Sequence, residues 1–304
     1  MQIMSLITAL PGAAAQGLIW GIMAIGVYIT FRILDIADLT VDGTLCTGGA
    51  VCIMMMLSGH NVWVSMLVAT GAGLLAGLAT GIFHTFMGIP AILAGILTQL
   101  SLYSINLKIM GKANQAINVD KFNLLVSLRR VKGVALTQNT LFIVAIMIII
   151  LIAVLYWFFG TELGCSLRAT GCNPSMSRAQ GINTDRNKVL GLMLSNGLVA
   201  LSGALLTQYQ GFADINMGRG SIVIGLAAVL IGAAIFSRIF RNFALKLLSV
   251  VFGSILYYLV LQIVIWMGID TDLLKMLSAL VVAFFLAFPY WKGKYFTKAK
   301  QGGK

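Results

Sequence analysis

The chain has 304 residues, of which 59% are hydrophobic and 10% are charged, and its mean hydropathy is +0.96. A soluble domain has about 25% charged residues, so this composition excludes a soluble globular protein and indicates an integral membrane protein. The net charge of +12 is expected to mark orientation and contact with the headgroups of the lipid bilayer, and we expect no nucleic acid partner. The four cysteines include no C-x-x-C pair, so we expect no metal site.

Apolar runs suited to crossing about 30 Å of hydrocarbon follow one another along the chain, without the alternating pattern of a membrane barrel. We predict an all-α polytopic membrane protein with about nine transmembrane helices. They are expected near residues 10–31, 43–57, 61–86, 89–107, 139–159, 190–209, 221–237, 244–267 and 272–290. The second run is short, so a half-helix is an alternative there. Within the third, the small residues from Gly71 to Gly81 predict close helix packing.

Two polar segments interrupt the apolar pattern, "DIADLTVDG" at 35–43 and "GFADINMGRG" at 211–220. A backbone break at membrane depth is tolerated only where protein buries it or where it lines a cavity, and the ends of half-helices present dipoles to a charged substrate. We predict that these segments flank a substrate pathway from its two ends, through Asp38, Thr40, Asp42, Asp214, Asn216 and Arg219. The alternative is a pair of ordinary aqueous turns in which Asp38 caps the following helix.

Polar side chains within the predicted spans are further candidates for substrate contact, because each is costly in the membrane unless it is paired or wetted. The pathway candidates of this kind are Gln99, Tyr103, Asn106 and Gln208. Hydrogen bonds that hold helices together are the alternative role for each of them.

The segment 160–189 is predicted to form a polar loop with a short helix. We expect Asn173 to cap the N-terminus of this helix and Pro174 to occupy its first position. Gly181 is expected to end the helix. Such a capped helix between two spans is suited to docking into another protein, although an ordinary solvated loop is the alternative.

Short similarities suggest an internal repeat. "ADLTV" at 37–41 is similar to "ADINM" at 213–217, and "MGIP" at 87–90 is similar to "MGID" at 267–270, in the same order. An odd number of predicted spans separates the copies, so we predict two inverted repeats. Chance similarity within an apolar sequence is the alternative.

The distribution of Lys and Arg predicts the orientation. A basic tail at 291–304 and the loop 160–189 lie on one side if the spans alternate, and the positive-inside rule makes that side cytoplasmic. The N-terminus is then external. The basic loop at 108–138 would be external as well, which reduces the excess of Lys and Arg on the cytoplasmic side.

The stretch "GTELGCSLRATGCNPSMSRAQGIN" at 160–183 resembles the coupling segment of bacterial ABC importer permeases for branched-chain amino acids, ribose-type sugars and nucleosides. The similarity extends to "ADLTVDGTLCTGGA" at 37–50 and to "GRGSIVIGLAAVLIGAAIF" at 218–236, and so covers nearly the whole chain. The chain departs from the family pattern near 222–224, where an acidic residue is absent, and at Ala233, which stands in place of a second glycine.

This resemblance implies a single transmembrane permease domain over 1–304 with a BtuC-like, type II-related importer fold in the bacterial inner membrane. It also implies a second permease copy in a homodimer, a cytoplasmic ABC ATPase dimer and an extracytoplasmic substrate-binding protein. The residues implied to couple to the ATPase are Arg168, Gly171, Asn173, Arg178, Gly181, Ile182 and Asn183. No G-x-x-x-x-G-K-[ST] motif is present, so we expect no cofactor on this chain and no catalytic residue, with ATP and Mg²⁺ bound by the ATPase.

Amino acids, branched-chain or aromatic, are the substrates that the short chain favours. Sugars or nucleosides are the alternative. An ion-coupled secondary transporter would fit the repeats and carboxylates equally well, but it does not explain the coupling pattern. An intramembrane aspartyl protease would need a G-x-G-D sequence, and neither Asp38 nor Asp214 lies in one.

Overall fold

The computed structural model describes residues 2–119, 122, 124–131, 139–236, 240 and 242–267, with a few positions between 273 and 287. Most of the predicted ninth span and the whole basic tail lie outside these residues. The long helices are α1 (Gln2–Tyr28), α2 (Thr40–Leu57), α3 (Val62–Thr85), α4 (Ala91–Met110), α5 (Thr140–Gly160), α8 (Thr184–Gln210), α9 (Ser221–Phe236) and α10 (Phe243–Trp266). The shorter elements are the π-helix η1 (Ile29–Ile33), β1 (Asn114–Ala116), the 3-10 helix η2 (Leu128–Val131), α6 (Glu162–Cys172), α7 (Pro174–Ala179) and β2 (Phe212–Asp214).

The protein is an all-α membrane bundle, as predicted. Among the described residues, seven helices are long and apolar enough to cross a membrane: α1 continued through η1, α2, α3, α4, α5, α8 and α10. The helix α9, with 16 residues, is shorter. Eight of the predicted spans therefore correspond to helices, and the full span count stays a prediction.

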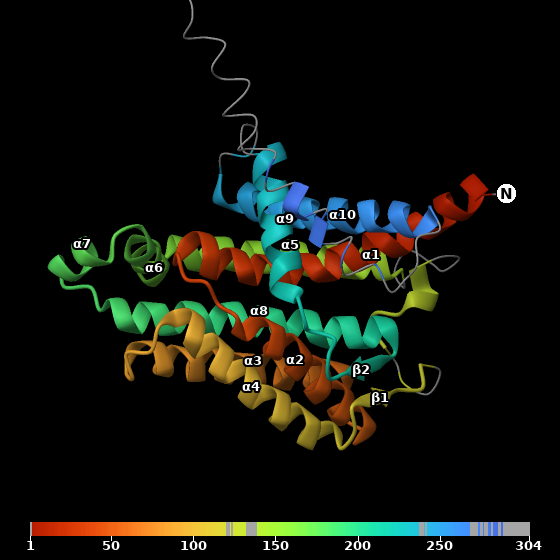
Figure 1. The fold of residues 1–304 in the computed structure, drawn as a ribbon, viewed down its shortest axis with the longest axis horizontal. Helices are drawn as coiled ribbons and strands as arrows, with labels where there is room; N and C mark the ends of the chain where they lie inside the picture. Colours follow the sequence, from red (N-terminus) through yellow and green to blue (C-terminus); the bar gives the residue numbers. More distant parts are fainter. Residues whose placement is uncertain are drawn as a thin grey trace, which may run out of the picture.

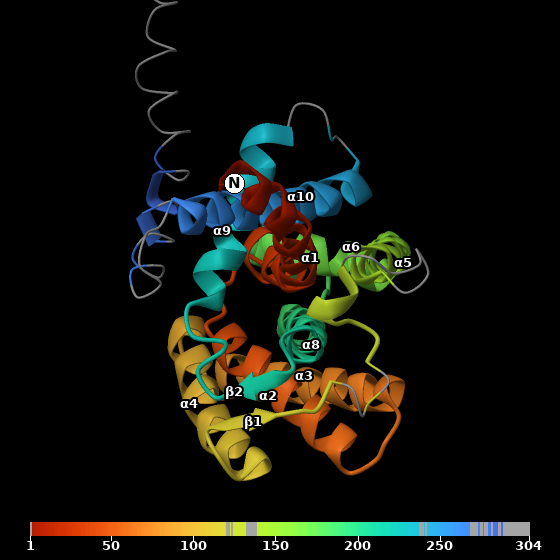
Figure 2. The same cartoon turned by 90° about the vertical axis from the view of Figure 1, so that its right-hand side faces the viewer.

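The bundle is built around α8. This helix runs between α1 on one side and the group α2, α3 and α4 on the other, while α9 and α10 cover the far side of α1 (Figures 1 and 2). The side chains of Ile19, Ile22 and Met23 on α1 are fully buried between these layers. A central helix with neighbours on both sides has few positions where a polar side chain can reach lipid or water.

Glycines allow α3 to approach α8 closely. A Cβ atom on Gly73 or Gly77 would collide with the backbone of α8 at Asn196 or Leu192, whereas one on Gly71 would meet nothing within 4 Å. The four-residue spacing puts Gly73 and Gly77 on one face of the helix, which is the arrangement that small residues give to membrane helix pairs. The predicted packing role of this glycine segment is confirmed.

The two ends of the bundle carry different polar structures. The helices α6 and α7 project at one end, and the β1–β2 pair lies at the other, together with the start of α1 (Figure 1). The two strands are antiparallel, with Asn114 opposite Asp214. The start of α1 and the segment with α6 and α7 thus lie at opposite ends, and the orientation in the membrane stays a prediction. The inverted-repeat layout stays a prediction.

Candidate functional site

The first polar break, residues 34–39, brings a buried carboxylate to the start of α2. The Asp38 side chain is 2% exposed, and its Oδ1 accepts a hydrogen bond from the Thr40 amide at 2.9 Å. Its Oδ2 accepts one from Asn196 Nδ2 at 2.7 Å. Since Asn196 lies near the middle of α8, α2 begins at membrane depth, and protein groups satisfy the break as the absence of water requires.

A chain of hydroxyl groups continues from this point between α2, α3 and α4. Thr40 Oγ1 lies 2.7 Å from Thr80 Oγ1, which donates to Thr98 Oγ1 at 2.9 Å. Thr44 Oγ1 donates to Asn196 Oδ1 at 2.7 Å. Sequence reasoning did not select Thr44, Thr80 or Thr98, because threonine is common in membrane helices and only the partners reveal its role. Asp38 and Thr40 are thus held by hydrogen bonds between helices.

The second polar break is joined to the first by Asp42. Its carboxylate, in the first turn of α2, accepts hydrogen bonds from the Gly220 amide at 2.9 Å, the Ser221 hydroxyl at 2.8 Å and the Ile222 amide at 3.0 Å. These groups form the N-terminus of α9, which has otherwise unpaired N–H groups and a positive dipole end. Asp42 therefore caps α9 from another helix and brings the starts of two helices together inside the bundle.

A cavity of about 330 Å³ lies at this junction. It is bounded by α2, by α4 and by the segment that leads into α9. Its lining residues are Asp42, Gly43, Cys46, Gln99, Leu100, Tyr103, Asn106, Ile215 and Arg219. Five of the predicted pathway residues, from three separate parts of the chain, are thus brought to one cavity. Its volume is in the range of small-molecule sites.

Asn106, in the wall of this cavity, has an unused acceptor. The side chain is 1% exposed, and its Oδ1 has no hydrogen-bond partner among the described residues. The amide nitrogen lies 3.4 Å from the carbonyl oxygen of Gly43. A buried acceptor without a donor costs about 1–3 kcal/mol, so a donor group on a bound molecule would recover that free energy.

Arg219 and Tyr103 give the same cavity a cation and an aromatic ring. The Arg219 side chain is exposed and, within the described residues, forms no ion pair. Tyr103 is 42% exposed. A cation, an amide acceptor and an aromatic ring complement a carboxylate, an amino group and an aromatic side chain, which are the three parts of an aromatic amino acid.

The cavity opens on a face of α4 that the described residues leave uncovered. Among the seven spans, α4 is the least apolar and α5 the most apolar. The exposed residues of α4 include Ser101 and Tyr103 beside Leu100 and Ile105, whereas those of α5 include Ile149. The exposed face of α5 therefore suits lipid, and that of α4 combines apolar and polar groups.

The remaining predicted pathway residues do not line this cavity. Gln208 is 1% exposed, and its Oε1 accepts a hydrogen bond from the Leu125 amide at 3.3 Å. Asp214 accepts from the Asn216 amide at 2.7 Å and from Asn114 Nδ2 at 3.4 Å, beside the β1–β2 pair. These contacts organise the end of the bundle that carries the strands.

At the opposite end, the predicted short helix forms as α7 with both predicted caps. Asn173 Oδ1 accepts a hydrogen bond from the Met176 amide at 3.0 Å. Gly181 has a φ of 81°, and the amides of Gly181 and Ile182 donate to the carbonyl oxygens of Arg178 and Ser177 at 3.0 and 3.1 Å. This is the Schellman pattern that glycine favours at the end of a helix.

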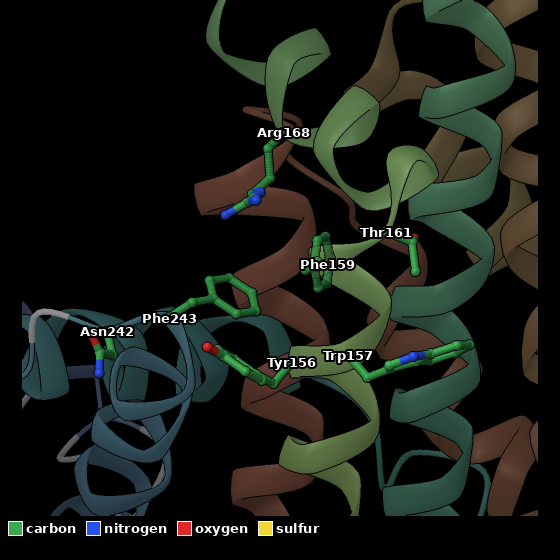
Figure 3. Close-up of a pocket in the computed structure, with 8 residues that line it drawn as sticks. Tyr156, Trp157, Phe159, Thr161, Arg168, Asn242 and Phe243 are labelled. Atoms are coloured by element: carbon green, nitrogen blue, oxygen red, sulfur yellow. The ribbon is translucent and has the colours of Figure 1, made fainter.

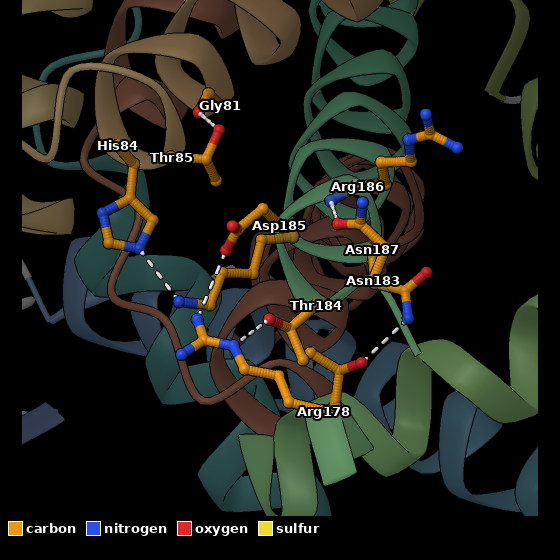
Figure 4. A network of polar contacts seen from close by, with 11 residues as sticks. Gly81, His84, Thr85, Arg178, Asn183, Thr184, Asp185, Arg186 and Asn187 are labelled. Carbon is orange, nitrogen blue, oxygen red and sulfur yellow. Dashed lines mark hydrogen bonds and ion pairs between the residues drawn. The ribbon is translucent and has the colours of Figure 1, made fainter. Parts of the chain in front are cut away.

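Side-chain contacts attach α7 to the start of α8 (Figure 4). Arg178 Nε donates to Thr184 Oγ1 at 2.7 Å, and the same guanidinium lies 3.4 Å from Asp185 Oδ1. Asn183 caps α8 by accepting from the Arg186 amide at 3.0 Å. These contacts join α7 to the first turn of α8.

Two of the predicted coupling residues have other neighbours. A Cβ atom on Gly171 would collide with the backbone of Ile33, so this glycine packs α6 against η1. The guanidinium of Arg168 lies over the ring of Phe243, 5.8 Å from its centroid (Figure 3). The coupling pattern thus combines residues of the short helix with residues that pack α6.

A protein-family model described as "Branched-chain amino acid transport system / permease component" matches residues 10–286. The chain belongs to this family of permeases. It is 38% identical over 272 residues to "Tyrosine transport system permease protein" of Clostridioides difficile (strain R20291), covering 90% of this chain and 88% of that protein. It is 25% identical over 246 residues to "Fructose import permease protein FruF" of Bifidobacterium longum (strain NCC 2705), covering 81% of this chain and 67% of that protein. The solved structure "PsaBC from Streptococcus pneumoniae in complex with Fab" covers 86% of this chain and 95% of that chain, with a TM-score of 0.43 and 18% identity.

The chain is a multi-pass membrane protein, and its relatives are permease subunits of transporters, as the resemblance implied. This assignment replaces both the secondary transporter and the intramembrane protease that the aspartates alone allowed. The family match does not test the roles of individual residues in the permease. The positions assigned to coupling and to the pathway remain predictions, now with a defined geometry.

Proposed function

We propose that the permease imports amino acids with aromatic side chains. The observation that carries this proposal is the cavity in which the unpaired acceptor of Asn106, the cation of Arg219 and the ring of Tyr103 meet. The relative named for tyrosine transport, 38% identical, supports this choice of substrate. In the proposed pose, the substrate ammonium donates to Asn106 Oδ1 and its carboxylate pairs with Arg219.

The proposed transporter contains two copies of this permease. The uncovered, comparatively polar face of α4 is the surface that the second copy would cover, and the cavity would then lie between the two chains. A separate cytoplasmic ABC ATPase dimer would bind and hydrolyse ATP with Mg²⁺, since this chain has no phosphate-binding motif. An extracytoplasmic binding protein would deliver the substrate to the end with the β1–β2 pair.

This arrangement places α7 on the cytoplasmic side of the bacterial inner membrane, with an external N-terminus and a cytoplasmic C-terminus. The ATPase dimer would hold α7 and favour one conformation when it binds ATP, because a ligand shifts an equilibrium only through its different affinities for two states. Arg178 would pass the displacement to α8, and the Asn196–Asp38 bond would pass it to the start of α2. Asp42 would then move the N-terminus of α9 at the cavity.

Competition for uptake tests the choice of substrate. Cells that express the permease with its ATPase and binding protein are given labelled tyrosine together with an excess of phenylalanine, leucine, ribose or adenosine. Aromatic amino acids should compete most strongly. If ribose or adenosine competes and phenylalanine does not, the sugar or nucleoside alternative replaces this proposal.

A further inference from the structure

A second cavity, of about 480 Å³, shares no lining residue with the cavity at Asp42. It is formed where α5 ends, where α6 begins and where α10 begins (Figure 3). Its wall includes Tyr156, Trp157, Thr161, Arg168, Asn242 and Phe243. Because the ends of two membrane-spanning helices form it, the cavity lies at the boundary between hydrocarbon and water, at the end of the bundle that carries α6.

The lipid-facing wall of this cavity is aromatic. Trp157 is 72% exposed and Tyr156 is 56% exposed, and Val154 on the same helix is 56% exposed. Tryptophan and tyrosine concentrate at the headgroup level of membranes, where the ring contacts acyl chains and the polar atom reaches water. The cavity therefore opens toward lipid and not only toward the aqueous phase.

The inner wall carries a cation without a carboxylate partner. The Arg168 guanidinium contacts Cys165 Sγ at 3.4 Å and the face of Phe243, and within the described residues no acidic side chain pairs with it. Asn242 occupies the N-cap of α10 but forms no side-chain capping bond. The first turn of α10 thus adds a positive dipole end to the cation, and an anion would satisfy both.

We propose that this cavity binds the phosphate of an anionic phospholipid from the surrounding leaflet. The guanidinium of Arg168 and the amides at the start of α10 would hold the phosphate oxygens. The acyl chains would lie along the aromatic and aliphatic surface of α5. Basic pockets between membrane helices are suited to anionic headgroups, and the apolar wall favours a lipid over a free phosphate. The bound lipid would brace α5, α6 and α10 beside the coupling segment, independently of the transported substrate.

Thermal unfolding of the purified full-length permease in detergent tests this proposal. Phosphatidylglycerol should raise the midpoint by about 3 °C. Phosphatidylcholine and soluble glycerol 3-phosphate should leave it unchanged. An equal shift with glycerol 3-phosphate would assign the cavity to free anions, and an equal shift with phosphatidylcholine would show general lipid stabilisation; either result overturns the proposal.

Two variants connect the shift to the cavity. Arg168→Gln should abolish the response to phosphatidylglycerol, whereas Arg186→Gln, which removes an exposed arginine from the first turn of α8, should retain it. Asn242→Asp supplies a capping carboxylate that should keep or raise the basal midpoint while repelling the phosphate, so it remains informative if Arg168→Gln folds poorly. A full response in Asn242→Asp and in any folded Arg168→Gln protein would contradict the proposal.

Discussion

Two buried asparagines in this permease have opposite hydrogen-bonding states. Asn196 on α8 donates to Asp38 and accepts from Thr44, so both ends of its amide are used. Asn106 on α4 is also buried, yet no donor from the described part of the chain reaches its Oδ1. A polar group that remains unpaired in a folded protein calls for an explanation, and a ligand is one. The contrast separates a structural amide from a candidate ligand-binding amide.

Substitution by leucine distinguishes these two roles. Asn106→Leu should change the free energy of unfolding by about 1 kcal/mol, because it removes an unpaired acceptor and only the long 3.4 Å contact to the Gly43 carbonyl oxygen, while tyrosine uptake is lost. Asn196→Leu should destabilise the protein by about 3 kcal/mol, since Oδ2 of the buried Asp38 carboxylate loses its donor while Oδ1 keeps the Thr40 amide. Thermal unfolding and uptake are measured on both variants. Strong destabilisation by Asn106→Leu would assign this residue to packing.

The carboxylate of Asp42 is predicted to hold α9 in place. Asp42→Ala removes the acceptor for three donors and should lower the free energy of unfolding by about 2 kcal/mol. Asp42→Asn keeps one acceptor oxygen and should cost less. The two variants are compared by thermal unfolding in detergent. Equal stability of Asp42→Ala and the unmodified protein would show that α9 does not depend on this cap.

At the scale of elements, the close contact between α3 and α8 depends on the glycines on the face of α3 that packs against α8. Gly77→Val should destabilise the protein by about 2–3 kcal/mol, because the new side chain would collide with the backbone of Leu192. Gly71→Val adds the same atoms where nothing lies within 4 Å, so its stability should be nearly unchanged. Thermal midpoints of the two variants provide the comparison. A similar loss in both would contradict the packing of α3 against α8.

The contact between α7 and α8 is predicted to carry the signal from the ATPase. Arg178→Ala removes the bonds to Thr184 and Asp185 and should leave basal ATP hydrolysis of the assembled transporter intact while substrate-dependent stimulation falls several-fold. Arg186→Ala, in the first turn of α8, is the matched control. If Arg178→Ala retained stimulated hydrolysis and uptake at the control's level, this contact would not be the coupling route.

At the scale of the whole molecule, the sequence predicts features that depend on neighbouring residues. It does not predict which residues far apart in the chain form hydrogen bonds with one another. The caps of α7 follow from Asn173, Pro174 and Gly181, which are neighbours in the sequence. The bond from Asp42 to the start of α9 joins residues about 180 positions apart, and no local pattern marks it. For the same reason the sequence grouped Asp38 with Asp42, although the first is buried among threonines and the second lines the cavity.

The central claim is that ATP hydrolysis by a partner drives import through this permease. The most direct measurement is tyrosine uptake into proteoliposomes that contain the permease, its ATPase and its binding protein, with ATP trapped on the α7 side. Uptake should require trapped ATP and all three components, and it should persist without an ion gradient. Uptake by the permease alone under a proton or sodium gradient would contradict the account.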